Sequence, residues 1–254
     1  GQLGHLSLRL RNAAELHDRH PLAVAQRSAR LAPFHAIVGN YNGFAIYDVA
    51  DPAHPTLRTA ALCFGGQNDV SVYGDLLFVS VESTFARIDC ATGGADATTR
   101  FRGIRIFDIS DLDNPVQIGG VQTCRGSHTH TLVTGPDDAS HVYLYNSGTA
   151  GVRSATEMAG CDSGPATNES PSRWLVEVIE VPLANPAAAS IVNHARLFTD
   201  PDSGAYNGLQ NTPTGTPHPS GPAYSPTPNT NHCTTSRPTP SSASPPGRAP
   251  VTAC

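Results

Sequence analysis

One 13-residue phrase occurs twice in the chain without a gap, and it decides the fold. Residues 43–55 read GFAIYDVADPAHP, and residues 103–115 read GIRIFDISDLDNP. Each copy begins with β-branched and aromatic residues, which favour a strand, and runs into an acidic segment that ends in proline and favours a turn. A second run of strand-forming residues follows each copy, at 56–62 and at 116–123. The repeated unit is therefore predicted to be a β-hairpin with a fixed turn.

Further strands surround this hairpin. A third, more divergent copy, LVEVIEVPLANP, occupies residues 175–186. A strand pair precedes the second copy at 68–80 and the third at 128–145, whereas only the strand 36–40 precedes the first. Four short antiparallel strands per unit are typical of a β-propeller blade. We therefore predict an all-β fold, an incomplete β-propeller of about three blades.

The repeat spacing also predicts where the loops lie. The equivalent glycines Gly43 and Gly103 are 60 residues apart, which exceeds the roughly 40–45 residues of a minimal blade. The extra length falls in two polar insertions, 82–102 and 147–173. Both insertions are predicted to be loops on a face of the propeller.

Proline divides the chain into regions. Twelve of the 22 prolines lie after Thr199, and the apolar runs that could build a core stop near Phe198. A segment of this composition buries too little apolar surface to offset its conformational entropy. We expect blades over residues 36–198, a poorly defined segment at 1–35, and a disordered Pro/Ser-rich tail at 199–254.

The end of the tail has the composition of GC-rich coding DNA translated out of register. DNA that encodes residues 234–254 can also encode, one base earlier, the sequence HDITPYPVVGLAAGACSGHGM, which resembles the opening strands of another blade. We expect the chain to be a fragment with 234–254 out of frame and the downstream blades missing. The alternative is an ordinary Pro/Ser linker or stalk.

These phrases resemble the repeat of the LVIVD-repeat proteins, which are bacterial β-propellers. The resemblance covers residues 36–198, and its clearest copy is 68–119. It implies an exported or surface-anchored protein of unassigned role. It also implies architectural roles for the repeated residues: Asp48 and Asp108 tie strands together through backbone hydrogen bonds, and Pro55 and Pro115 set the turn.

Composition narrows the classes of partner and the compartment. The net charge is −5 and the pI about 6.1, which argues against a nucleic-acid or anionic-membrane surface. No apolar run reaches the roughly 18 residues of a membrane span. Six cysteines without a CxxC pair are compatible with disulfides in an extracellular, periplasmic or cell-surface protein.

Histidines are the residues that could form an active site. His128 and His130 alternate on one predicted strand, so their side chains point to the same face and could reach one metal ion. His232 could join them near a central channel. Neutral imidazole suits copper, zinc or iron. Equally, His128 and His130 could be structural or could line a polar channel through hydrogen bonds.

The cysteines are expected to hold loops together. Cys63 and Cys124 occupy equivalent positions after the last strand of consecutive blades, and Cys90 and Cys161 lie in the two insertions. A Cys90–Cys161 bond is one possible pairing, and a bond from Cys63 or Cys124 to Cys233 is another. The spacing alone leaves the connectivity open.

The sequence leaves two functions open for this protein. We expect a non-catalytic scaffold that binds a protein, peptide or glycan; Tyr41, Tyr145 and Trp174 are the aromatic residues that could contribute, although each also suits a core or strand position. The alternative is an enzyme, a copper- or zinc-dependent oxidoreductase or hydrolase with His128 and His130 in a channel. That arrangement resembles selenium-binding-protein-like propellers.

Overall fold

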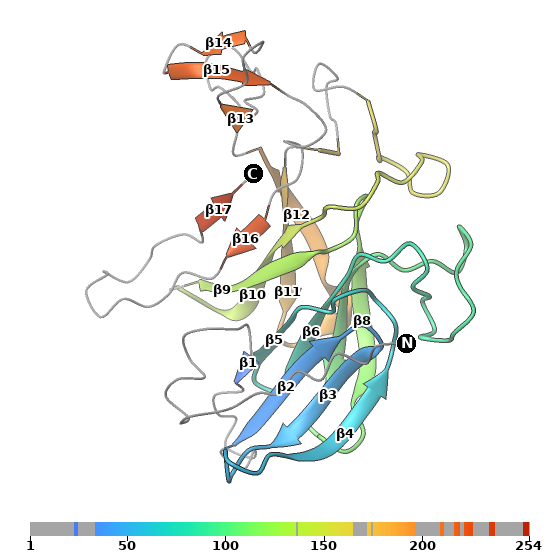
Figure 1. The fold of residues 1–254 in the computed structure, drawn as a ribbon, viewed down its shortest axis with the longest axis vertical. Coiled ribbons are helices and arrows are strands. Elements are labelled where there is room, and N and C mark those ends of the chain that lie inside the picture. Colours follow the sequence, from blue (N-terminus) through green and yellow to red (C-terminus); the bar gives the residue numbers. More distant parts are fainter. Residues whose placement is uncertain are drawn as a thin grey trace.

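The computed structural model describes residues 34–135, 137–164, 172–173 and 175–196, together with short strands at 23–24, 209–210, 216–218, 221–225, 234–236 and 251–253. Three antiparallel four-stranded sheets form the main part of the fold, and in each sheet the strands follow chain order (Figure 1). We call the sheets blades 1, 2 and 3. Apart from the 3₁₀ turn η2 (Pro186–Ala188), the described residues contain no helix.

The strands of each blade lie as follows. Blade 1 contains β1 (Ala23–Val24), β2 (His35–Asn40), β3 (Gly43–Asp48) and β4 (Thr56–Leu62). Blade 2 contains β5 (Val70–Tyr73), β6 (Leu76–Val81), β7 (Gly103–Asp108) and β8 (Val116–Gln122). Blade 3 contains β9 (Thr129–Gly135), β10 (Asp138–Ser147), β11 (Val176–Pro182) and β12 (Ser190–Ala195). The predicted all-β organisation in three four-stranded blades is confirmed.

The pairing register shows that the three blades are copies of one unit. The third and fourth strands of each blade pair with a register shift, and the shift falls at Ile46/Tyr47, Ile106/Phe107 and Val178/Ile179. These positions coincide when the repeats are aligned on Gly43 and Gly103. A bulge bends its strand and increases the local twist, so each blade bends at the same place.

Asp48 and Asp108 bond to the backbone as predicted, but they do so within the repeated turns rather than between strands. Asp48 Oδ1 accepts the backbone N–H of Ala50 at 2.8 Å, and Asp108 Oδ1 accepts that of Ser110 at 2.8 Å. The next aspartates in each copy, Asp51 and Asp111, accept a backbone N–H two residues further on, at 3.0 and 2.9 Å. Side-chain bonds of this kind stabilise a tight turn without help from distant residues.

The repeated glycines are required by close backbone packing. Gly43 and Gly103 have φ of +147° and +144°, a conformation that residues with a side chain rarely adopt. A Cβ at Gly43 would lie 2.0 Å from the carbonyl oxygen of Ala61, and one at Gly103 would lie 2.0 Å from that of Val121. Glycine lets the third strand start directly against the fourth.

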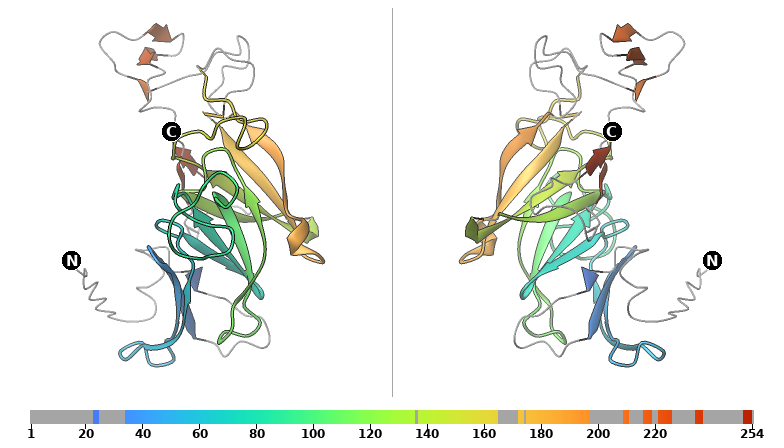
Figure 2. Two further views of the ribbon diagram at one scale, coloured as in Figure 1. Left: turned by 90° about the vertical axis from the view of Figure 1, so that its right-hand side faces the viewer. Right: turned by 90° about the vertical axis from the view of Figure 1, so that its left-hand side faces the viewer.

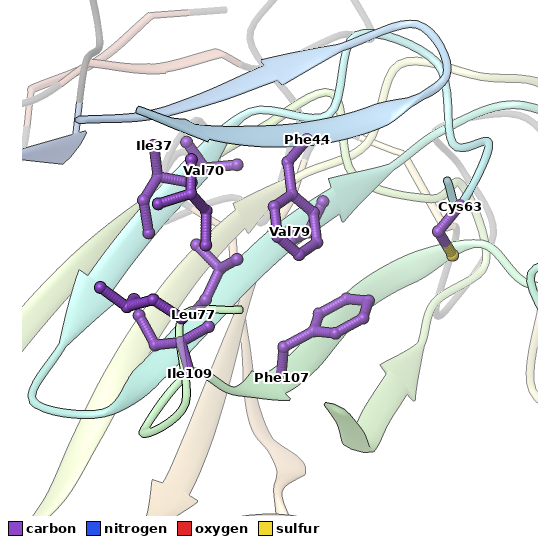
Figure 3. Packing of buried hydrophobic residues seen from close by; sticks show 10 residues of the cluster. Ile37, Phe44, Cys63, Val70, Leu77, Val79, Phe107 and Ile109 are labelled. Atoms are coloured by element: carbon purple, nitrogen blue, oxygen red, sulfur yellow. The ribbon is translucent and has the colours of Figure 1, made fainter. Parts of the chain in front are cut away.

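Two hydrophobic cores lie between the blades rather than within them. The first joins blades 1 and 2 and is drawn in Figure 3; there Phe44 meets Phe107 edge to face at 5.1 Å between ring centroids. The second joins blades 2 and 3. Its fully buried members are Phe78, Ile104, Ile106, Val142, Leu144, Ile179 and Val181. Figure 2 shows the three sheets following one another face to face.

The structure differs from the predicted boundaries at both ends. Blade 1 has a fourth strand, because β1 pairs with β2 through Ala23↔Ile37 and Val24↔Ala36, within a segment for which no strand was predicted. The tail, predicted to be disordered, contains the sheet of β13 (Leu209–Gln210), β14 (Thr216–His218) and β15 (Gly221–Ser225) and the pair of β16 (Thr234–Ser236) and β17 (Val251–Ala253). Strands this short need only a few local hydrogen bonds and no apolar core.

Candidate ligand-binding face

The two insertions lie at one end of the blades. Consecutive strands run antiparallel, so the connections alternate between the ends. The β2–β3, β6–β7 and β10–β11 connections and both connections between blades fall at the same end. We call this end the loop face; its described residues are 41–42, 63–69, 82–102, 123–128, 148–164, 172–173 and 175.

Two disulfides hold the loop face in a repeated pattern. Cys63 follows the last strand of blade 1 and bonds to Cys90 in the insertion of blade 2. Cys124 follows the last strand of blade 2 and bonds to Cys161 in the insertion of blade 3. Each insertion is thus attached to the end of the preceding blade.

This pattern corrects the predicted pairings. The Cys90–Cys161 bond is wrong, and so is a bond from Cys63 or Cys124 to Cys233, because these cysteines already have partners. Each insertion bonds to the end of the preceding blade rather than to the other insertion. The spacing of the cysteines along the chain does not reveal this arrangement. Cys233 itself lies outside the described residues.

Two buried arginines, one from the insertion of blade 2 and one from the connection between blades 2 and 3, fix the insertion of blade 3. Arg102 Nη2 donates to the carbonyl oxygen of Gly151 at 2.6 Å. Arg125 donates from Nε to that of Ala150 at 2.8 Å and from Nη2 to that of Thr149 at 3.0 Å. Burial lowers the pKa of both guanidinium groups to about 10, so both stay charged at neutral pH. Several charge-assisted bonds to one short segment hold its backbone in a single conformation.

A carboxylate joins the two insertions. Glu157 Oε2 in the insertion of blade 3 lies 2.7 Å from Arg100 Nη1 in the insertion of blade 2. The other oxygen of Glu157 lies 3.4 Å from Arg153 Nε, and Arg153 Nη1 donates to Gln122 Oε1 at 2.7 Å. The Arg153 and Glu157 side chains are only 4% and 11% exposed, so solvent screens this ion-pair network weakly.

His128 belongs to a partly exposed cluster on the loop face. Its Nδ1 lies 2.8 Å from Glu82 Oε2, and the same oxygen accepts the Thr149 hydroxyl at 2.8 Å. The side chains of His128 and Glu82 are 27% and 22% exposed. One carboxylate therefore ties the start of blade 3 to both insertions.

His130 has a different environment, because it is buried between blades 2 and 3. Its Nε2 lies 2.6 Å from Ser71 Oγ and its Nδ1 lies 2.7 Å from Ser80 Oγ. Ser80 Oγ is in turn 2.7 Å from Ser127 Oγ, and Asp69 Oδ2 accepts the backbone N–H of His130 at 3.0 Å. The His130 side chain is 0% exposed, so it lines no open channel.

The polar row of His130 continues across blade 3. His130 pairs with Asn146, and Asn146 pairs with Glu177, which places the three side chains on one face of the sheet. Asn146 Nδ2 donates to Glu177 Oε2 and to the carbonyl oxygen of Gly126. Burial raises the pKa of the Glu177 carboxyl to about 7, against the opposing effects of the Asn146 hydrogen bond and Arg125.

The predicted metal site is not assembled by the described residues. Both ring nitrogens of His130 face serine hydroxyls, and within the described ranges no group of three His, Cys, Asp or Glu side chains could hold a metal ion. His232 lies outside those ranges. A copper or zinc site formed by His128, His130 and His232 stays a prediction.

Exposed aromatic side chains occur on the loop face. Tyr41, in the β2–β3 turn, is 67% exposed, and Phe85, in the insertion of blade 2, is 65% exposed. Of the other aromatic candidates, Tyr145 is half-buried in β10 and Trp174 lies outside the described residues. Sequence reasoning missed Phe85; an aromatic residue within an otherwise polar insertion was the signal that could have found it.

Three antiparallel blades with equivalent bulges, equivalent turns and interfacial cores define a β-propeller repeat protein. The family model for the LVIVD repeat matches residues 35–61, which span β2 to β4 in blade 1. The chain therefore contains an LVIVD repeat, as its sequence predicted. No curated protein matches the chain. Among the described residues, no helix has the length and apolar composition that crossing a membrane requires.

Proposed function

We propose that this chain is a non-catalytic binding scaffold of an oxidising compartment, extracellular, periplasmic or at the cell surface, and that it binds a peptide or glycan on its loop face. The observation that carries the proposal is the repeated disulfide pattern, Cys63–Cys90 and Cys124–Cys161. Stable disulfides are a feature of proteins outside the reducing cytosol.

Rigid loops support a binding role. A ligand that meets loops already held in one conformation loses less affinity to the ordering of those loops. Here each insertion is held by a disulfide, and that of blade 3 is also held by Arg102 and Arg125 through backbone carbonyl groups. Within the described ranges, the opposite end of the blades has only short turns, which offer less surface that could differ between proteins of this fold.

The exposed aromatic pair supports a peptide or glycan as the ligand. Large aromatic side chains contribute strongly to binding energy and cost energy to leave in water without a partner. Tyr41 and Phe85 are both about two-thirds exposed, and Phe85 lies within the segment that the Cys63–Cys90 bond closes. The net charge of −5 argues against a nucleic acid.

The test is a binding screen with matched variants. The full chain is incubated with an array of polysaccharides and a library of short peptides, and the affinity of each hit is measured by calorimetry. We expect Tyr41→Ala and Phe85→Ala each to weaken binding about tenfold. Phe34→Ala is the control, because Phe34 is also exposed, at 51%, but lies at the opposite end of blade 1.

Two results would overturn the proposal. One is the absence of any binder in both collections. The other is a ligand whose affinity falls with Phe34→Ala and not with the two loop-face variants, because that ligand would bind the end with the short turns.

A further inference from the structure

Blade 2 receives blade 3 on a face with a mixed composition. Aliphatic and aromatic side chains, Phe78, Ile104 and Ile106, form the core of this contact. Next to them, the hydroxyls of Ser71 and Ser80 lie 2.6 and 2.7 Å from the two ring nitrogens of His130. Apolar packing and an imidazole between two hydroxyls therefore hold the blades together.

The register identifies the matching positions in blade 3. Ser71 pairs with Phe78, and Phe78 pairs with Ile106, in blade 2; Thr131 pairs with Tyr145, and Tyr145 pairs with Val178, in blade 3. The bulges at Ile106 and Val178 anchor the same alignment. It matches Ser71 with Thr131, Phe78 with Tyr145, Ser80 with Ser147, Ile104 with Val176, and Ile106 with Val178.

The face of blade 3 that points away from blade 2 therefore has the composition of the receiving face of blade 2. We call residues Thr131, Tyr145, Ser147, Val176 and Val178 the outer face of blade 3. It repeats a hydroxyl at two positions, an aromatic ring at one and an aliphatic side chain at two. A sheet face exposed to solvent would instead carry mainly polar and charged side chains.

The two hydroxyls of this face are buried and have no hydrogen-bond partner. Thr131 is 2% exposed and Ser147 is 0% exposed. Neither Thr131 Oγ1 nor Ser147 Oγ has a partner in the part of the chain that the structure describes. Buried polar atoms of native proteins are nearly always paired, so both atoms are positioned for a group that reaches this face.

The contact between blades 1 and 2 shows how the two sides match. The position of Ser80 is occupied in blade 1 by Gly39, and the position of His130 is occupied in blade 2 by Val70, which packs in the apolar core. An apolar residue thus takes the place of the imidazole where a glycine takes the place of the hydroxyl. Because blade 3 presents hydroxyls, the matching incoming group is an imidazole.

The chain itself places a strand at this face. β16 lies beside β9 and β10, where the first strand of a following blade would lie (Figure 1). Residues 231–234 read NHCT and residues 127–130 read SHTH, so aligning His232 with His128 places Thr234 at the position of His130. By this alignment, the sequence has threonine at the position for which the outer face of blade 3 suits histidine.

We propose that the outer face of blade 3 is a docking surface for the segment that begins at Thr234, and that Thr131 and Ser147 form a receptor for an imidazole at position 234. The imidazole would lie between the two hydroxyls as His130 lies between Ser71 and Ser80. The segment would then form the first strand of a further blade.

The test installs the imidazole in the full chain. Thr234→His is expected to raise the melting temperature by about 3 °C or more, and the new ring should show both nitrogens hydrogen-bonded by ¹⁵N NMR. Thr235→His is the control, because neighbouring residues of a strand point to opposite faces. The gain should disappear when Thr234→His is combined with Ser147→Ala and Thr131→Val.

Three results would overturn the proposal. The first is an equal rise in melting temperature for Thr234→His and Thr235→His. The second is a gain that survives the removal of both hydroxyls. The third is dimerisation of Thr234→His in sedimentation, because the outer face of blade 3 would then take a second copy of the chain rather than its own segment.

Discussion

His130 Nε2 of blade 3 lies 2.6 Å from Ser71 Oγ of blade 2, across 59 residues of sequence. The second nitrogen of the same ring lies 2.7 Å from Ser80 Oγ. Every polar atom of this fully buried imidazole therefore faces the preceding blade. This contact fixes how the two sheets pack. The contacts of the surrounding apolar side chains are non-directional and would fix the packing less precisely.

Replacing His130 should destabilise the fold strongly. His130→Ala leaves a cavity and removes the imidazole from two buried hydroxyls, of which that of Ser80 keeps its contact with Ser127, so we expect the free energy of unfolding to fall by about 2–4 kcal/mol. His128→Ala is the matched comparison and should cost about 1 kcal/mol or less, since its side chain is 27% exposed and its contact with Glu82 is partly solvated. Urea unfolding measures both. Equal losses for the two variants would contradict the different environments of the two histidines.

Gly103 should tolerate no side chain. A Cβ there would lie 2.0 Å from the carbonyl oxygen of Val121, at a φ of +144°, so Gly103→Ala must move two strands apart, and we expect a loss of about 3 kcal/mol or more. Gly74 also has a positive φ, +57°, but has no atom within 4 Å of its Cβ position. Gly74→Ala should therefore cost only about 1 kcal/mol. Thermal unfolding of both variants distinguishes crowding from backbone conformation.

Each disulfide should stabilise the chain. The bonds close segments of 27 and 37 residues, for which loop entropy predicts about 3–4 kcal/mol each. Replacing both cysteines of one pair by serine should lower stability by this order and increase hydrogen exchange in the attached insertion. Peptide mapping without reductant should recover the Cys63–Cys90 and Cys124–Cys161 peptides. A Cys90–Cys161 peptide would show that the loop face is connected differently.

Glu177 should make stability fall as the pH rises. Burial raises the pKa of the folded carboxyl to about 7 from its ordinary 4.5, so the folded chain keeps a proton that the unfolded chain releases. The stability from the protonated form is complete below pH 4.5 and is lost as the pH rises toward and past 7, by at most about 3 kcal/mol. Glu177→Gln should remove this loss. Unfolding curves at pH 5 and pH 8 measure the difference, and parallel pH profiles for both proteins would contradict the assignment.

Local sequence predicted the strands well where the strand and its turn lie together. The predicted segments 56–62 and 116–123 correspond to β4 and β8, and the predicted strand pair at 68–80 corresponds to β5 and β6. These elements depend on neighbouring residues: β-branched runs, aspartates that bond to the next backbone N–H, and glycines that allow an unusual φ. β1 was missed, because its two residues form a strand only through pairing with β2.

The candidate site was predicted only in part. The sequence placed Cys63, Cys90, Cys124 and Cys161 among the disulfide cysteines and both insertions on a face, but it left their pairing open. It grouped His128 and His130 because they alternate along a strand. The structure separates them: one lies in a partly exposed cluster with Glu82, and the other is buried among serines.

The sequence by itself determined the repeated blade, because hairpin, turn and bulge arise from contacts within a few residues and from one recurring phrase. Only the tertiary structure decided which blade faces which, and with that the two disulfides and the partners of His130. Those contacts join residues 27–61 positions apart, whose meeting depends on how whole sheets pack. Packing of sheets buries apolar surface without regard to sequence distance, so no local pattern specifies it.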